Sequence, residues 1–348
     1  MTADAVGGVW TYAVDLARGL RAHGVETTLL VNGPAPGAPP ADVPVIATGL
    51  PLDWLATRPK AVTAAGEALA SLAGELGAEM IQLNSPAYAA GVRFPAPVIG
   101  VQHSCTATWW RAVRGDEPWP ADFDWRFDLA RRGLLACDRT VAPTSAFAAA
   151  VQAEYALGEA PVAVWNGRSA APEEARTHED AYVFTAGRLW DESKGMAVLD
   201  AAASRLSTPV LAAGPLAAPG GEEARFTHLQ AVGVLAAPEL RRRLAGAAVF
   251  VSPSLYEPFG LAVLEAAQAN LPLVLADIPT FRELWDGAAV FTPPHDAAAL
   301  AQVLETLLAD PARRETLGTA ARERSRRYSA EAMAAGMAGV FTALQSAT

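Results

Sequence analysis

The stretch that decides the fold is SPSLYEPFGLAVLEAAQANLPLVLAD, residues 252–277. It starts at the end of the apolar run VFVSP (249–253) and finishes in a second run, PLVLAD (272–277), with a helical pattern between them. A strand, a helix and a strand in this order form a βαβ unit, whose two strands run parallel. The stretch therefore predicts a parallel sheet that is covered by helices.

The same alternation of short apolar runs and helical patterns extends over nearly the whole chain. Helices are expected over 9–22, 60–76, 122–136 and 145–157. Further strands are expected at VETTLLVN (25–32), VPVIA (43–47), MIQLN (80–84), PVIGVQH (97–103), RTVAPT (139–144), YVFTAGR (182–188), PVLAAG (209–214), THLQAVG (227–233) and AAVFTP (288–293). This pattern predicts an α/β protein with two Rossmann-like, doubly wound parallel-sheet domains.

The boundary between the two domains is expected in the polar segment RSAAPEEARTHED (168–180), which has no periodicity. The N-terminal domain would then comprise residues 1–168 and the C-terminal domain residues 169–329. The tail from Asp296 to Ser346 has a helical pattern with an interruption near Tyr328-Ser329. We expect the helix after this interruption, about 330–348, to cross back to the first domain.

Composition narrows the possible functions. The chain has 348 residues, 51% of them hydrophobic, and a formal net charge of −10. An acidic protein is a poor partner for nucleic acid, which requires a concentrated basic surface. Two cysteines favour a reducing compartment, and no apolar run approaches the roughly 20 residues that cross a bilayer. We expect a cytoplasmic protein with at most peripheral membrane contact.

Two acidic residues flank the helix predicted in the deciding stretch. Pro258 suits the first position of a helix, so the helix is expected to begin there. The amides of Phe259, Gly260 and Leu261 would then lie in the first turn and favour an anion or a sugar oxygen. Glu265 would lie roughly 9–12 Å along the axis from Glu257, at a rise of about 1.5 Å per residue. Two acids at this separation could hold hydroxyls at both ends of one nucleotide sugar, although such a pair more often reflects capping and surface charge.

A second candidate is the segment TAGRLWDESKG (185–195), where a strand is followed by Arg188 and Lys194. Two cations at one strand end can stabilise the negative charge that develops when a glycosidic bond to a diphosphate breaks. The alternative is a pair of exposed loop cations without a function.

Glu257 and Glu265, with PFGLAVL between them, resemble the Glu-x7-Glu motif of the retaining GT-B glycosyltransferases, and look most like family four. The resemblance implies that Glu265 binds the ribose hydroxyls and that Glu257 lies beside the transferred sugar. It also implies that Arg188 and Lys194 contact the donor pyrophosphate. Asn270 departs from the family, which has Gly at this position, but Asn tolerates a left-handed backbone.

The resemblance assigns further residues less directly. It places Gly233, Val234 and Leu235 near the nucleotide base, and the pair Gly7-Gly8 near the donor phosphates or the acceptor. His103 follows a strand, where a parallel sheet binds ligands, and it could donate a hydrogen bond to a sugar hydroxyl. The tryptophans 109, 110, 119 and 125 suit either a core or stacking on a sugar or a lipid-linked acceptor.

The start of the chain, MTADAVGGVW, leaves little room for the strand that should precede Gly7-Gly8. We expect either a natural start several codons upstream or a short surviving strand. Asp122-Phe123-Asp124 has the form of a metal-binding motif of another glycosyltransferase fold. Because it precedes a helical pattern, these acids are expected to act as caps and first-turn charges, and no metal is assigned.

The resemblance implies a hexosyltransferase for polysaccharide or glycoconjugate biosynthesis that retains anomeric configuration and needs no cofactor or metal. The donor would be a nucleotide diphosphate sugar, and the acceptor a saccharide, a lipid-linked molecule or a small molecule. Two alternatives remain open from the sequence: a nucleotide-sugar epimerase of the same fold, and a non-catalytic sugar-nucleotide-binding subunit.

Overall fold

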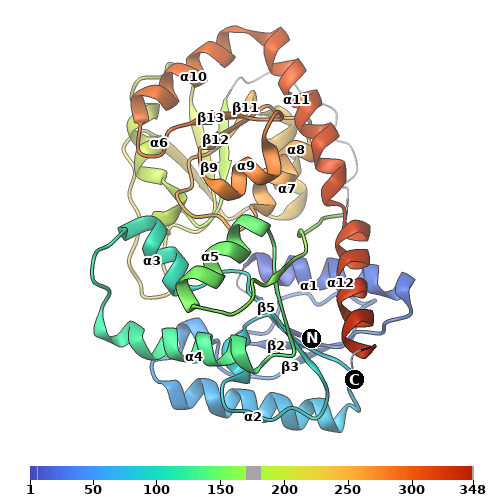
Figure 1. Ribbon diagram of the computed structural model, residues 1–348. Coiled ribbons are helices and arrows are strands. Elements are labelled where there is room, and N and C mark those ends of the chain that lie inside the picture. The colour runs from blue at the N-terminus through green and yellow to red at the C-terminus, as the bar shows by residue number, and fades with distance from the viewer. Residues whose placement is uncertain (6, 170–181, 347–348) are drawn as a thin grey trace. The chain divides into compact units, whose positions relative to one another are not determined.

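The computed structural model describes residues 1–5, 7–169 and 182–346 (Figure 1). The chain divides into two compact units. Unit 1 comprises Met1–Ser169 together with Ser329–Thr348, and unit 2 comprises Ala170–Tyr328. The segment expected from the sequence to link two domains, 168–180, lies almost entirely outside the described residues.

Unit 1 contains two parallel sheets with the strand orders β1-β2-β3 and β4-β5-β6-β7. The strands are β1 Thr2–Asp4, β2 Leu29–Asn32, β3 Val45–Ala47, β4 Ile81–Leu83, β5 Val98–Val101, β6 Arg139–Ala142 and β7 Val162–Ala163. The two sheets meet where Asn84, directly after β4, bonds to Thr2: the Asn84 amide N donates to Thr2 Oγ1 (2.8 Å) and Asn84 Nδ2 donates to the Thr2 carbonyl (2.6 Å). Side-chain hydrogen bonds thus join β1 to β4.

The helices of unit 1 include one that follows unit 2 in the chain. This helix, α12, packs against α1 (Figure 1), and the approach is so close that a Cβ on Gly19 would lie 2.6 Å from the Ala334 Cβ. The crossing back expected from the sequence therefore occurs. The helices and 3-10 turns of unit 1 are α1 Gly8–Leu20, η1 Arg21–His23, η2 Asp53–Leu55, α2 Pro59–Glu75, η3 Pro86–Ala89, α3 Thr106–Arg114, η4 Ala121–Phe123, α4 Asp124–Ala136, α5 Ser145–Tyr155 and α12 Ala330–Gln345.

Unit 2 is built on one six-stranded parallel sheet with the order β10-β9-β8-β11-β12-β13. Its strands are β8 Val183–Ala186, β9 Val210–Ala213, β10 Leu229–Gly233, β11 Val249–Ser252, β12 Leu273–Ala276 and β13 Val290–Thr292. Its helices and 3-10 turns are η5 Glu192–Lys194, α6 Met196–Ala203, α7 Ala237–Gly246, α8 Leu261–Gln268, α9 Pro279–Trp285, α10 Ala297–Ala309, α11 Pro311–Ser325 and η6 Arg326–Tyr328.

Each face of the unit 2 sheet has its own apolar core, because side chains alternate along a strand. Phe184 and Phe250 pack into one core with Trp285, whereas Val183 and Val249 pack into the other with Leu304. Both faces are therefore buried, as continuous apolar runs predict. The order of the strands reverses between β8 and β11, and such a point is where open α/β sheets bind ligands.

The predicted fold class is confirmed, since every expected strand forms, each shorter than its apolar run. The break near Tyr328-Ser329 is also present, and a further break occurs at Asp310, directly before Pro311. The strand that precedes Gly7-Gly8 exists as the three-residue β1. Helix α3 was not expected.

Candidate functional site

A short polar contact in unit 2 joins the two loops at the point where the strand order reverses. Lys194, after β8, donates from Nζ to Glu257 Oε2, after β11, at 2.7 Å. The two side chains are only 14% and 19% exposed. The pair places an ammonium and a carboxylate side by side at the sheet edge where open α/β sheets bind ligands.

The loop that carries Lys194 has a defined conformation. Asp191 Oδ1 accepts hydrogen bonds from the Ser193 amide (3.0 Å) and hydroxyl (2.6 Å), and the Ser193 carbonyl accepts from the Leu255 amide (2.8 Å). Gly195 has a positive φ of 66°, and a Cβ there would lie 2.2 Å from the Pro253 carbonyl oxygen. The β8 loop is therefore fixed against the β11 loop at this glycine.

Arg188 lies in the same loop. Its NH2 atom is 2.7 Å from Asp191 Oδ2, in an ion pair whose carboxylate is 5% exposed while the Arg188 side chain is 45% exposed. Its guanidinium carbon lies 5.5 Å from the centre of the Trp190 ring. Asp191 thus orients both the cation and the turn that leads to Lys194.

The predicted start of the helix after Glu257 is wrong. Helix α8 begins at Leu261 and not at Pro258, because Gly260 has a left-handed φ of 91° that a helix interior cannot accept. The first helical hydrogen bond runs from the Leu264 amide to the Gly260 carbonyl (3.1 Å). The amides without an intrahelical acceptor therefore start at Leu261, and Phe259 lies in the preceding loop, 3% exposed.

Glu265 is a half-buried residue of α8, whereas Glu257 lies in the loop before it. The axial separation expected for two residues on one helix therefore does not apply. Asn270, two residues after α8, has a φ of 62°. The expectation that it accepts a left-handed backbone is confirmed.

Gly233, at the end of β10, has a φ of 74° and open space where a side chain would begin. Val234 after it is 75% exposed, and Leu235 packs at the edge of the core. A glycine at an exposed strand end lets a ligand approach the backbone closely.

In unit 1, His103 follows β5 and contacts Tyr12 on α1 and Asn84 directly after β4. Its Nε2 is 3.2 Å from Asn84 Oδ1, and its ring meets the Tyr12 ring edge-on at a centroid distance of 4.4 Å. Burial lowers the pKa of His103 to about 4. The imidazole is therefore neutral at physiological pH. Gly7 caps α1, the helix that carries Tyr12, and Gly8 is its first residue.

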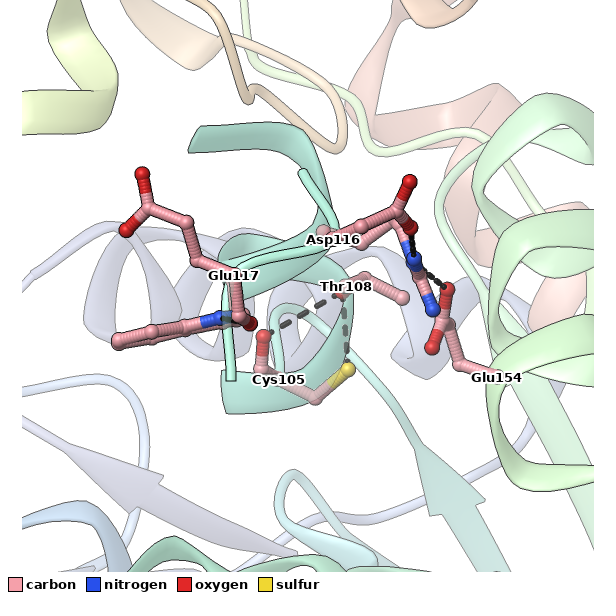
Figure 2. A network of polar contacts seen from close by, with 7 residues as sticks. Cys105, Thr108, Asp116, Glu117 and Glu154 are labelled. Atoms are coloured by element: carbon pink, nitrogen blue, oxygen red, sulfur yellow. Dashed lines mark hydrogen bonds and ion pairs between the residues drawn. The ribbon is translucent and has the colours of Figure 1, made fainter. Parts of the chain in front are cut away.

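The segment after His103 forms α3, which polar contacts hold in place (Figure 2). Cys105 Sγ and Thr108 Oγ1 are 2.9 Å apart, and Arg111 bonds Glu154 on α5 (Nε–Oε1, 3.0 Å) as well as Asp116. Trp109 and Trp110 on α3 are half-buried, and Trp110 Nε1 donates to the Glu117 carbonyl (2.7 Å).

Asp124, in the first turn of α4, accepts from Trp119 Nε1 (3.0 Å). Its role is the helix-start one expected from the sequence. Among residues 1–5, 7–169 and 182–346, no three His, Cys, Asp or Glu side chains gather as a metal site would require. Within the same ranges no helix is both long and apolar enough to span a membrane.

Two family models match the chain. Residues 6–167 match Glycosyltransferase Family 4, and residues 180–310 match Glycosyl transferases group 1. The chain belongs to the glycosyltransferases.

Solved structures support the fold of this glycosyltransferase. The sucrose-phosphate synthase from Thermosynechococcus elongatus superposes with a TM-score of 0.84 at 20% identity, over 100% of this chain and 96% of that one. Anabaena HepE in complex with UDP-glucose gives a TM-score of 0.74 at 18% identity, over 99% and 100% of the two chains. The separate parallel sheets are thus those of the GT-B architecture.

Curated relatives match the glycosyltransferase over shorter segments. Glycogen synthase of Mycobacterium tuberculosis is 42% identical over 95 residues, which are 27% of this chain and 23% of that protein. D-inositol 3-phosphate glycosyltransferase of Xylanimonas cellulosilytica is 41% identical over 110 residues, 30% of this chain and 26% of that protein. The matches therefore span about a quarter of these relatives' length.

Sequence reasoning missed two residues of this glycosyltransferase that organise its loops. Asp191 has a readable signal, since an Asp two residues before a Ser caps a turn, as the contacts to Ser193 confirm. The sequence signal for Asn84 is weaker, since it is only a polar residue at the end of an apolar run. Of the predicted residues, the structure brings Lys194 and Glu257 into direct contact.

Proposed function

We propose that this glycosyltransferase transfers a hexosyl group from a nucleoside diphosphate sugar to an acceptor hydroxyl, with retention of anomeric configuration and without a metal ion. The observation that carries the proposal is the Lys194–Glu257 contact of 2.7 Å between the loops after β8 and β11. It sets a cation and an acid side by side at the sheet edge where a Rossmann-like unit binds nucleotides.

The cations of unit 2 suit the diphosphate. Lys194 and Arg188 lie in one loop, and Arg188 keeps a half-exposed guanidinium that Asp191 orients. Paired cations stabilise the charge that develops on the leaving phosphate oxygen. The first-turn amides of α8, which start at Leu261, add donors without a charge of their own.

The remaining residues would bind the other parts of the donor. Glu257 would accept from hydroxyls of the transferred sugar and Glu265 from those of the ribose, while Gly233, Val234 and Leu235 would border the base. Anabaena HepE was solved with UDP-glucose. We extend a nucleotide sugar of this kind to unit 2 as its donor, and assign the acceptor, a saccharide, lipid-linked or small molecule, to unit 1 with Gly7, Gly8 and His103.

The reaction that we propose needs no protein nucleophile. The bond from the anomeric carbon to the diphosphate oxygen breaks, and its electron pair stays on the diphosphate. The acceptor oxygen then bonds to the same face of the anomeric carbon, and its proton passes to the departing phosphate oxygen. The protein's part is to orient both molecules and to stabilise the leaving charge.

We place this chemistry in the cytoplasm. Cys105 and Cys137 are thiols and not disulfide partners, and burial raises the pKa of Cys137 to about 12, so this thiol stays protonated and unreactive. Cysteines that remain as thiols suit a reducing compartment.

The test is a panel of UDP-, GDP- and ADP-sugars with and without saccharide acceptors, in which released nucleotide and anomeric configuration are measured. Nucleotide release that depends on an acceptor, with an α product from an α donor, supports the proposal. Interconversion of the donor without an acceptor would identify an epimerase, and binding without turnover a non-catalytic subunit.

Variants connect the activity to the site. We expect Lys194→Ala to lower kcat by about 10²–10³-fold, the usual cost of removing one group that stabilises transition-state charge. Lys60→Ala, an exposed residue of α2, is the matched control. Equal turnover by Lys194→Ala and Lys60→Ala would contradict the assignment.

A further inference from the structure

The side chain of Asn84 has one possible orientation. Its Nδ2 atom lies 2.6 Å from the Thr2 carbonyl oxygen, which can only accept a hydrogen bond. The other amide atom, Oδ1, therefore faces His103 and Gln82, with distances of 3.2 Å to His103 Nε2 and 2.9 Å to Gln82 Nε2.

This orientation determines which ring nitrogen of His103 carries the proton. An amide oxygen cannot donate, so the 3.2 Å contact requires a proton on His103 Nε2. The orientation of Gln82 is fixed in the same way, because turning its amide would place Gln82 Oε1 against Asn84 Oδ1, and neither oxygen can donate. Gln82 Nε2 instead donates both to Asn84 Oδ1 and to the Tyr12 hydroxyl (3.2 Å).

The surroundings keep the ring neutral. Tyr12 packs on it from α1, Asn84 contacts it from directly after β4, and Gln82 of β4 bonds both of these residues. Tyr12 is the titratable group in ring contact, and its own pKa is raised by burial, so it remains an uncharged phenol. Burial, rather than a neighbouring charge, lowers the pKa of His103 to about 4. A neutral ring with its proton on Nε2 has an unprotonated Nδ1.

We propose that Asn84 is a positioning residue that holds His103 as the Nε2–H tautomer, so that His103 Nδ1 accepts a hydrogen bond from a substrate hydroxyl. The identity of that hydroxyl as part of a sugar or a sugar acceptor rests on the proposed function. The proposal reverses the expectation from the sequence, in which His103 donates. A hydroxyl at this position would then have to be a donor, so the site selects for an O–H and against an ether.

The tautomer can be measured directly, without turnover. The ring ¹⁵N chemical shifts distinguish protonated from unprotonated nitrogens, and the chain has five histidines, so the His103→Gln variant identifies the signals of His103. We expect Nε2 to be protonated and Nδ1 unprotonated from pH 6 to pH 8. A proton on Nδ1, or an imidazolium in this range, overturns the proposal.

Asn84→Asp tests the role of the amide. The variant loses the hydrogen bond that Asn84 Nδ2 donates to the Thr2 carbonyl and gains a carboxylate beside Nε2–H. A carboxylate at this position favours the charged ring, and we expect the pKa of His103 to rise by about 1–3 units. Asn32→Asp is the matched control: Asn32 ends β2 and its Oδ1 accepts from Thr48 Oγ1 (2.7 Å). The control should leave the His103 signals unchanged. An equal pKa in both variants would contradict the role of Asn84, and if Asn84→Asp does not fold, the wild-type spectrum alone decides.

A pH profile then links the tautomer to transfer. A neutral acceptor is lost when the ring is protonated, so transfer by Asn84→Asp should fall about tenfold for each pH unit below its raised pKa. The wild-type enzyme should show no such fall above about pH 5. Parallel profiles would contradict the acceptor role of Nδ1. Should the protein catalyse no transfer at all, the proposed function fails while the ¹⁵N measurement still tests the tautomer.

Discussion

Gly195 joins the loop of Lys194 to the rest of unit 2, and replacing it with alanine should damage stability and catalysis together. Two costs add. The residue has a φ of 66°, where alanine loses about 1–2 kcal/mol. In addition, the new Cβ would lie 2.2 Å from the Pro253 carbonyl oxygen, and relieving such an overlap by a backbone shift costs about 1–3 kcal/mol.

Gly287→Ala separates these two costs. Gly287, also in unit 2, has a φ of 77° with nothing within 4 Å of the added Cβ, so it bears the backbone cost alone. In a unit of this size about 1 kcal/mol lowers Tm by roughly 2–4 °C. If the overlap costs about 2 kcal/mol, Gly195→Ala should melt about 4–8 °C below Gly287→Ala.

The assay is thermal unfolding of both variants, followed by the donor assay. Since the shift would move the loop that ends in Lys194, Gly195→Ala should also lower kcat, while Gly287→Ala should not. Equal melting temperatures would refute the close approach of the two loops. Equal turnover with unequal melting temperatures would refute the link between this contact and the position of Lys194.

Three further outcomes are expected. The pKa of His103 is about 4 in the folded protein and about 6.5 in the unfolded chain, so between these values the unfolded chain binds the extra proton. The free energy of unfolding should therefore fall by about 3 kcal/mol as the pH drops from 6.5 towards 4. His103→Gln should flatten this part of a plot of Tm against pH, whereas the control His23→Gln, at an exposed residue, should not. Asp191→Asn removes the ion pair that orients Arg188, and calorimetry should detect weaker UDP binding by about tenfold; unchanged affinity would exclude an Arg188–phosphate contact. Asn270→Gly should change the free energy of unfolding little, whereas Asn270→Leu should lose about 1–2 kcal/mol in urea titrations, and equal losses would contradict the left-handed backbone at 62°.

The sequence predicts the layers of this fold well, because a strand that is buried on both sheet faces appears in the sequence as a continuous apolar run. Val183 and Phe184 are adjacent and point to opposite cores, so both must be apolar. Helix α3 left no such trace, since its nine residues include two tryptophans and two arginines and its position depends on Arg111 contacts to the distant Glu154.

The candidate site was predictable as a set of residues but not as a geometry. Lys194 and Glu257 are 63 positions apart, and only the pairing of β8 with β11 brings their loops together. The start of α8 was misplaced because Pro258 is a good first residue. The left-handed φ of Gly260, where a Cβ would lie 3.2 Å from Phe281 and 3.3 Å from Val263, is a feature of the folded structure that the sequence does not display. Asn84 was missed because its role depends on contacts with Thr2 and His103, and the sequence does not show that these residues are its neighbours.

The place of α12 in the chain has a consequence for biosynthesis. The apolar side of α1, including Leu16 and Leu20, shares its core with Met337 and Phe341, which leave the ribosome only after all of unit 2. Unit 2 is continuous and can condense as soon as it emerges, whereas unit 1 must wait with an uncovered helix. The part of the protein that is translated first is therefore finished last, and chaperones that shield apolar surface would act on it during that interval.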